Sequence, residues 1–259
     1  MTKQDLEVAI SEKQIRLVYQ PKIECATGAL TGFEALARWD HPELGLVMPD
    51  LFIPLAEQSG LIDAITDQVA GQALRWYGDT PAVQGLTLSI NLSEKSLGNM
   101  ELADRLKAKC AEAGISEGCV ILEIAEQSAM DDQLLTLDMF AGLRMLGFRV
   151  SIDHFGLRET STPLLARLPF SEIKIDKSIA LADSRSFESQ EYIKSKVDLG
   201  HRLGLSVVTE GVEDRETLEF LKKIGCDIAQ GYYIACPMSG DLVTDWMYGR
   251  DEARMRRLL

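Results

Sequence analysis

Hydrophobic and polar positions along this chain follow two rhythms, which alternate in regular order. Runs with apolar residues at every second position are typical of strands, and longer runs with a spacing of three to four residues are typical of helices. Helices are predicted at 50–56, 60–77, 100–113, 132–146, 187–203, 214–224 and 240–256. Strands are predicted at 15–23, 30–39, 86–92, 119–125, 148–153, 171–176, 205–210 and 226–232.

Regular alternation of strand and helix favours a parallel sheet joined by helical crossovers. About eight strands in 259 residues predict an α/β fold, a (β/α)8 barrel of the TIM type that occupies 1–259 as a single domain. A short turn ending in Gly28 joins the first two strands, so one antiparallel strand is expected. An open doubly wound sheet is the alternative, and the lack of a glycine-rich phosphate loop after the first strand disfavours it.

Six of the predicted strands have, at or near their C-terminal end, a polar or charged residue that is unusual in a buried strand. In the strand 148–153, Val150 and Ile152 share one face and Asp153 lies on the other. If the apolar face meets the helices, the polar face points into the barrel. Its last residue then lies at the C-terminal rim, where barrel active sites are found. The six residues are Asn91, Glu123, Asp153, Lys174, Glu210 and Gln230.

One such residue alone is most often a helix cap or a solvated loop residue. Six of them on one rim indicate a binding site. Carboxylate and amide oxygens are the ligands that Mg²⁺ and Mn²⁺ prefer, and one or two such ions would polarise a phosphate and activate water. Lys174 is suited to stabilise the charge that develops on the phosphate. The pattern alone therefore predicts metal-dependent phosphoryl hydrolysis.

Composition narrows the choice of partners and compartment. The net charge is −13, from 40 acidic and 27 basic residues, so binding to extended nucleic acid is not expected, whereas a small phosphate ligand is compatible. The five cysteines form no CxxC pair, which argues against structural zinc and a disulfide framework and favours reduced thiols. No apolar run has the length of a membrane span and no signal peptide is visible, so a cytoplasmic location is expected.

The same residues lie in a series of motifs that resembles the EAL domain family of bacterial cyclic-di-GMP phosphodiesterases. The resemblance covers about 14–245. A single EAL tripeptide would be weak support, but here many motifs occur in the order and at the spacing of the family. They are Tyr19-Gln20-Pro21, Glu34-Ala35-Leu36, Arg38-Trp39, Asn91-Leu92-Ser93, Leu122-Glu123-Ile124, Lys174-Ile175-Asp176, Glu210-Gly211-Val212-Glu213 and Gln230-Gly231-Tyr232.

The resemblance implies a reaction that opens one phosphodiester of cyclic-di-GMP to give linear pGpG, with Mg²⁺ or Mn²⁺ as cofactor. It implies that Lys174 contacts the attacking water and that Glu34 and Glu210 take part in catalysis. Glu126 would support the loop after Asp153. The implied metal ligands are Glu34, Asn91, Glu123, Asp153 and Glu210, and the implied nucleotide-binding residues are Gln20, Leu36, Arg38 and Gln230.

The chain departs from the family pattern directly after Asp153. The family usually has a second aspartate there, and this chain has His154. In the loop at 157–162, Arg158 replaces a glycine and removes its conformational freedom. A neutral imidazole brings no negative charge and suits Mn²⁺ better than Mg²⁺, so the second ion is expected to bind more weakly. The alternative interpretation is that His154 packs beside the strand end without a ligand role.

Two functions are therefore compatible with the sequence. The chain is either a phosphodiesterase with weakened or metal-selective activity, or a degenerate domain that binds cyclic-di-GMP or a protein partner without hydrolysis. Retention of Lys174, Glu210 and Gln230 favours the enzyme, and His154 with the altered loop favours the receptor. A homodimer and a regulatory domain or protein partner are compatible with both.

Overall fold

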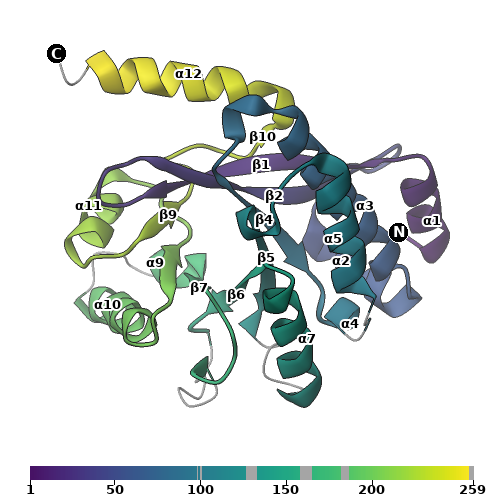
Figure 1. Cartoon of the computed structure of the whole chain (residues 1–259). Helices are drawn as coiled ribbons and strands as arrows, with labels where there is room; N and C mark the ends of the chain where they lie inside the picture. The colour runs from purple at the N-terminus through teal and green to yellow at the C-terminus, as the bar shows by residue number, and fades with distance from the viewer. Residues whose placement is uncertain (98, 100, 127–132, 158–164, 182–186, 257–259) are drawn as a thin grey trace.

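The computed structural model describes residues 1–259 except 98, 100, 127–132, 158–164, 182–186 and 257–259. Within this part, eight strands close into a barrel surrounded by helices (Figure 1), which confirms the predicted α/β barrel. The barrel strands are β1 (Ile15–Glu24), β2 (Leu30–His41), β4 (Thr87–Leu92), β5 (Val120–Ala125), β6 (Arg149–Phe155), β7 (Glu172–Ile175), β8 (Ser206–Thr209) and β9 (Ile228–Gln230).

The first strand closes the barrel and runs against its neighbours. β1 pairs antiparallel with both β2 and β9, whereas the successive pairs from β2 through β9 are parallel. The predicted antiparallel strand is therefore confirmed. Two short strands that the sequence pattern did not indicate, β3 (Gly45–Val47) and β10 (Met238–Ser239), extend the sheet beside β2 and β1.

Helices cover the outside of the barrel, and each of the predicted ones is present within a few residues. Figure 1 shows α3 and α5 together on one side and α10 and α11 on the opposite side. Among the described helices, α1 and the short α4 and α9 were not predicted; a capping box between Thr2 and Asp5 begins α1, which buries Leu6 and Ala9. The bounds are α1 (Lys3–Ser11), α2 (Pro49–Ser59), α3 (Ile62–Asp79), α4 (Glu94–Leu97), α5 (Leu102–Ala113), α7 (Gln133–Met145), α9 (Lys177–Leu181), α10 (Phe187–Arg202), α11 (Arg215–Lys223) and α12 (Gly240–Arg256).

The strands divide their side chains between an apolar outer face and a polar inner face. In β6, Val150 and Ile152 are fully buried in the hydrophobic core, and Ser151 between them is also fully buried. Lys22 of β1 contacts Glu123 of β5, and because these strands are not neighbours in the sheet, the contact crosses the barrel interior. The interior is therefore lined by polar groups that can be presented at the rim.

Two further expectations concern thiols and membranes. The five cysteines carry free thiols, of which Cys25, Cys110 and Cys226 are buried. Across the described residues, no helix combines the length and the apolar character that crossing a bilayer requires.

Candidate active site

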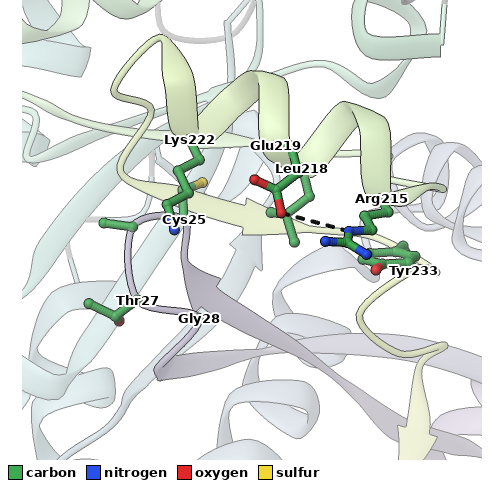
Figure 2. A pocket seen from close by; sticks show the side chains of 9 residues that line it. Cys25, Thr27, Gly28, Arg215, Leu218, Glu219, Lys222 and Tyr233 are labelled. Carbon is green, nitrogen blue, oxygen red and sulfur yellow. Dashed lines mark ion pairs between the residues drawn. The ribbon is translucent and has the colours of Figure 1, made fainter. Parts of the chain in front are cut away.

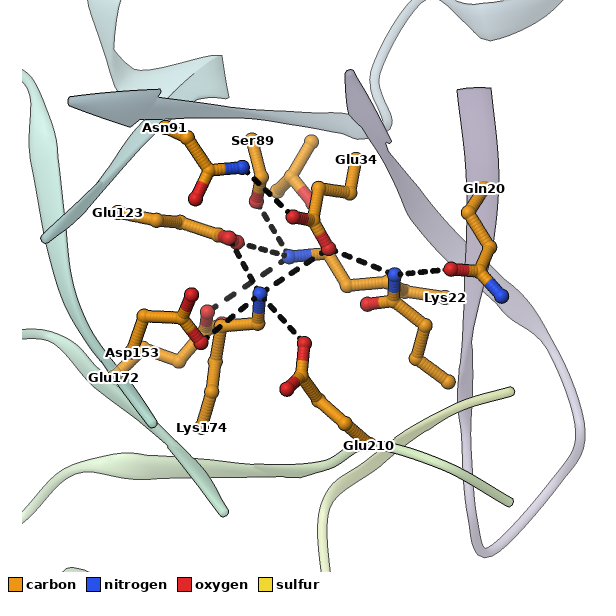
Figure 3. Close-up of polar contacts among 12 residues, drawn as sticks. Gln20, Lys22, Glu34, Ser89, Asn91, Glu123, Asp153, Glu172, Lys174 and Glu210 are labelled. Carbon is orange, nitrogen blue, oxygen red and sulfur yellow. Dashed lines mark hydrogen bonds and ion pairs between the residues drawn. The ribbon is translucent and has the colours of Figure 1, made fainter. Parts of the chain in front are cut away.

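Lys174 of β7 lies at the centre of a cluster of carboxylates inside the barrel (Figure 3). Its Nζ lies 2.5 Å from Glu123 Oε2, 2.9 Å from Glu210 Oε1, 3.1 Å from Glu34 Oε2 and 3.4 Å from Asp153 Oδ1. These carboxylates come from β5, the residue after β8, β2 and β6, so four separate segments converge on one ammonium group. Burial alone would lower the pKa of Lys174, but the surrounding carboxylates, Asp153 foremost, raise it above its usual value.

Glu34 is held by side-chain amides, and we call Glu34 with Gln20, Asn91 and Gln230 the amide-held side of the site. Asn91 Nδ2 donates to Glu34 Oε1 at 2.8 Å, and Gln230 Nε2 donates to Glu34 Oε2 at 2.8 Å. The same Gln230 nitrogen lies 3.1 Å from Gln20 Oε1. Asn91 is exposed while Glu34 is buried, so the site opens toward solvent past Asn91.

Asp153, His154 and Glu210 form the charge-held side, with Asp176 behind the histidine. One ligand atom from each of the three lies within 4.8 Å of the others. His154 Nδ1 lies 2.7 Å from Asp176 Oδ2, and Nε2 lies 3.4 Å from Asp153 Oδ2. The backbone of His154 has φ of +57°, a left-handed conformation that few residues other than glycine adopt. The carboxylates outweigh the effect of burial and raise the pKa of His154.

The chain leaves the site through Gly156, whose peptide groups are bonded to two side chains. Gly156 N donates to Glu126 Oε2 at 3.1 Å, and Tyr192 Oη of α10 donates to Gly156 O at 2.6 Å. Glu126 thus contacts the segment that the resemblance assigned to it. Arg158 and the remainder of the 157–162 loop lie outside the described residues, apart from the exposed Leu157.

Two glycines determine how the chain turns after Glu210 and Gln230, the predicted site residues at the ends of β8 and β9. Gly211, which follows Glu210, has φ of +69°, and a Cβ there would lie 2.6 Å from Lys177 Cβ. Gly231, which follows Gln230, lies so close to Val212 that a Cβ would meet its carbonyl oxygen at 2.2 Å. Both turns therefore require glycine, and they fix where Glu210 and Gln230 enter the site.

The site carries more negative than positive charge. Five carboxylates, from Glu34, Glu123, Asp153, Glu172 and Glu210, contact two ammonium groups, so full ionisation would leave an excess of three negative charges. Burial, followed by the charge of Glu123, raises the pKa of Glu34, and burial also raises the pKa of Glu210 to about 7. A hard divalent cation bound to this buried, oxygen-rich cluster would compensate its excess negative charge. The residues present therefore fit Mg²⁺ or Mn²⁺.

Glu123 differs from its acidic neighbours. Burial would raise its pKa, but Lys174 and Lys22 outweigh that effect and hold the pKa at about 2. Glu123 therefore stays ionised more readily than Glu34 and Glu210, whose pKa values are raised.

Leu36 and Arg38 lie on β2 beyond Glu34, on the same face of the strand. Both are half-buried, and burial lowers the pKa of Arg38. Arg38 Nη1 donates to the carbonyl of Ala37 at 2.8 Å, which uses one of the donors of the guanidinium group. The geometry places an arginine and an apolar side chain beside the open end of the acidic cluster.

Sequence reasoning missed a second layer of polar residues below the rim. Ser89, Ser151 and Glu172 each precede a rim residue by two positions, on β4, β6 and β7, and all three are fully buried. The period of two that identified the rim residues also points to these. Lys22 belongs to the same layer, but on the antiparallel β1 it follows Gln20 instead of preceding it.

A surface groove of about 560 Å³ lies elsewhere, between the β1–β2 turn and α11 (Figure 2). Arg215, Glu219 and Lys222 of α11 line it together with Thr27 and Gly28 of the turn. Lys174 and its carboxylate partners do not line this groove, so the groove is separate from the acidic site.

The architecture and the site define a mixed α/β barrel with a lysine-centred acidic cluster at its C-terminal rim. Comparison with known families gives the same result: the model of the EAL domain matches residues 3–237, and the chain belongs to the EAL domain family.

Relatives and solved structures agree with this assignment. The bifunctional diguanylate cyclase/cyclic di-GMP phosphodiesterase MucR of Pseudomonas aeruginosa is 35% identical over 241 residues, which are 92% of this chain and 35% of the relative. The cyclic di-GMP phosphodiesterase NbdA of the same organism is 34% identical over 238 residues, 91% of this chain and 30% of the relative. A solved PaMucR phosphodiesterase in complex with c-di-GMP superposes with a TM-score of 0.88 at 34% identity, covering 93% of this chain and 98% of that one. The chain thus spans about a third of the length of these curated relatives.

Proposed function

We propose that this chain hydrolyses one phosphodiester bond of cyclic-di-GMP to give linear pGpG, in a reaction that depends on Mg²⁺ or Mn²⁺. The observation that carries the proposal is the convergence of four carboxylates on Lys174 at the rim of an EAL barrel. The names of the relatives support the substrate, since MucR and NbdA are called cyclic di-GMP phosphodiesterases.

The carboxylate cluster and Lys174 would have distinct tasks in the reaction. The metal would be held by oxygen atoms of Glu34, Asn91, Glu123, Asp153 and Glu210. Bound there, it would polarise the phosphodiester and lower the pKa of a water molecule. Lys174 would orient the attacking water and stabilise the charge that develops on the phosphate.

The nucleotide would be held by residues of the amide-held side and of β2. Arg38 would pair with a phosphate group, because a guanidinium group presents several donors in a planar fork. Leu36 would pack against an apolar face of the ligand, and Gln20 and Gln230 would offer amide groups. Glu126 would maintain the segment after Asp153 through its bond to Gly156.

His154 favours Mn²⁺ over Mg²⁺ in this proposal. Its Nδ1 is bonded to Asp176, so Nε2 is the nitrogen that faces Asp153. Histidine ligands of metals commonly have their second nitrogen bonded to a carboxylate, which orients the ring. An imidazole nitrogen suits Mn²⁺ better than Mg²⁺, which prefers oxygen. Hydrolysis should therefore be faster with Mn²⁺.

A second candidate function is a receptor that binds cyclic-di-GMP without hydrolysis. The observation that favours it is that protein groups already provide partners for the carboxylates of the cluster. Lys174 contacts four of them, and two side-chain amides donate to Glu34. A site held together in this way needs no cation to keep its shape. Such a receptor would bind the nucleotide equally well in EDTA.

The two functions are separated by a time course of cyclic-di-GMP incubated with the chain and excess Mn²⁺, resolved by chromatography. Appearance of pGpG that EDTA abolishes is the expected result. Intact cyclic-di-GMP after long incubation, combined with calorimetric binding that EDTA does not weaken, would reject hydrolysis in favour of the receptor. A parallel series with Mg²⁺ tests metal preference, and equal or faster turnover with Mg²⁺ would contradict the role given to His154.

A further inference from the structure

Lys22 is a second lysine inside the barrel, one layer below the rim (Figure 3). It lies on β1, opposite Gln230 of β9 in register, and its side chain is 1% exposed. Because β1 runs antiparallel to its neighbours, the residue two positions after Gln20 lies deeper in the barrel. A lysine is rarely buried to this extent unless its ammonium group has specific partners.

Distances identify those partners. Lys22 Nζ lies 2.5 Å from Ser89 Oγ and 3.1 Å from Glu123 Oε1. Glu172 Oε1 is farther away, at 3.8 Å, and within the described part of the chain neither carboxylate oxygen of Glu172 has a hydrogen-bond partner. Glu172 therefore acts as a counter-charge at a distance, whereas Glu123 and Ser89 are bonded directly.

Each of the two carboxylate oxygens of Glu123 contacts a different lysine. Lys22 contacts Oε1 from β1, and Lys174 contacts Oε2 from β7. A carboxylate that is held at both oxygens by groups on two other strands cannot rotate freely about its last side-chain bond. The contact with Lys22 leaves Oε2, and not Oε1, directed at the cluster around Lys174.

We propose that Lys22 is a positioning residue, which fixes the orientation of Glu123 and thereby sets the affinity of the site for a divalent cation. The proposal rests on the proposed function, in which Glu123 is a metal ligand. A purely structural role is the competing explanation, in which Lys22 only offsets the buried charge of Glu172. The two explanations differ in what happens when both charges are removed together.

The test is the double variant Lys22→Met/Glu172→Gln, which removes one positive and one negative charge and leaves the net charge unchanged. Mn²⁺ binding is measured by titration calorimetry and by electron paramagnetic resonance of free Mn²⁺, neither of which requires turnover. Loss of an outer partner of a metal ligand typically weakens metal binding by about 10- to 100-fold, and we expect a loss of at least about tenfold here. Glu172→Gln alone is the matched control: it removes the same negative charge but keeps the contact of Lys22 with Glu123, so it should lose much less Mn²⁺ affinity than the double variant.

Folding is monitored through circular dichroism and melting temperature. A structural role would lower the melting temperature of the double variant while its Mn²⁺ constant stayed the same, and that result would overturn the proposal. So would a Mn²⁺ constant that falls equally in Glu172→Gln alone. If the double variant does not fold, Ser89→Ala keeps both charges and removes the other bond of Lys22; an unchanged Mn²⁺ constant in that variant would also reject the proposal.

Failure of the proposed function looks different from failure of this inference. If the unchanged chain binds no Mn²⁺, the metal site itself is wrong. If the unchanged chain binds Mn²⁺ and the variants bind it equally well, only the role of Lys22 is wrong. For variants that turn over, the nucleotide KM should stay constant while the Mn²⁺ concentration for half-maximal rate rises.

Discussion

The two sides of the site are built by different forces. On the amide-held side, neutral donors from Asn91 and Gln230 bind Glu34 at 2.8 Å each. On the charge-held side, Asp153 and Glu210 share Lys174, and His154 depends on Asp176. Amides neither gain nor lose protons, whereas the charged groups stabilise or repel each other according to what else is bound.

The difference indicates a division of labour. The amide-held side is joined to β1, β2 and β9, where the barrel closes, and should keep its geometry with or without a ligand. The charge-held side includes His154, whose backbone is left-handed, two residues before Gly156, whose peptide groups bond to Glu126 and Tyr192. Strained backbone of this kind often accompanies function. Changes there should tune metal preference, while changes on the amide-held side should remove activity altogether.

The largest effect is expected from Glu34→Ala. The substitution removes the acceptor of both amide bonds and one proposed metal ligand. Mn²⁺-dependent kcat/KM should fall by about 10³-fold or more, the upper range for removing one preorganised electrostatic group. The control is Glu43→Ala, which alters an exposed glutamate in the β2–β3 turn. Retention of full activity in Glu34→Ala would refute the assignment of this carboxylate.

Gly231→Ala should break the amide-held side through the backbone. The added Cβ would meet Val212 O and N at 2.2 and 2.3 Å, and both atoms belong to the main chain, so they cannot move aside cheaply. Overpacking of this kind costs about 1–3 kcal/mol, measurable by urea denaturation, and Gln230 should shift with it. Gly142→Ala in α7, where nothing lies within 4 Å, is the control and should be neutral or stabilising. Equal stability of the two variants would show that the turn tolerates a side chain.

His154→Asp tests the charge-held side directly. It replaces a nitrogen donor by a carboxylate, and Asp tolerates the left-handed backbone conformation found there. The rate with Mg²⁺ should rise about tenfold relative to the rate with Mn²⁺, the lower range for changes around a metal ligand. His154→Asn has a similar backbone preference without the charge and should not show this gain. If the Asp variant behaves as the unchanged chain, the limitation lies in the 157–162 loop.

The smallest effect is expected from Tyr192→Phe. This change removes the hydroxyl that donates to Gly156 O and keeps the ring of Tyr192 beside Lys196. One hydrogen bond is worth about 1 kcal/mol, so the rate of hydrolysis should fall only a few-fold. Tyr248→Phe on the exposed part of α12 is the control. An unchanged rate would mean that the bond from Tyr192 to Gly156 does not affect the rate of hydrolysis.

Local sequence rules predicted the fold and much of the rim. Strand and helix periods located the barrel elements, and the polar strand ends identified Lys174 and three of the carboxylates that the structure brings to it. The fourth, Glu34, was predicted only through the resemblance to the EAL family. The roles of these residues in catalysis and metal binding stay predictions. The second layer was not predicted, because the prediction considered only polar residues near the strand ends. Ser89 and Glu172 show the same alternation two positions earlier.

Other features depend on contacts that no local pattern encodes. Whether Lys22 lies above or below Gln20 depends on the direction of β1, and that direction is fixed by pairing with β2 and β9. The bond between Tyr192 and Gly156 joins residues 36 positions apart, and His154 adopts a left-handed backbone conformation although it is not glycine. The helix α1 was not predicted because its sequence is mostly polar and only Leu6 and Ala9 are buried.

Closure of the barrel through β1 also has a consequence for how the chain reaches its folded state. Gln20 and Gln230 are bonded across 210 positions of sequence, and β1 gains its second neighbour only when β9 is in place. During synthesis, β1 can therefore pair with β9 only after nearly the whole domain has been made. Pairing over such separations slows folding, and an unpaired strand edge favours aggregation in the meantime. A nascent chain that stops before Gln230 would present a hairpin with one open edge and a Glu34 that lacks the amide of Gln230, so activity should appear late and all at once.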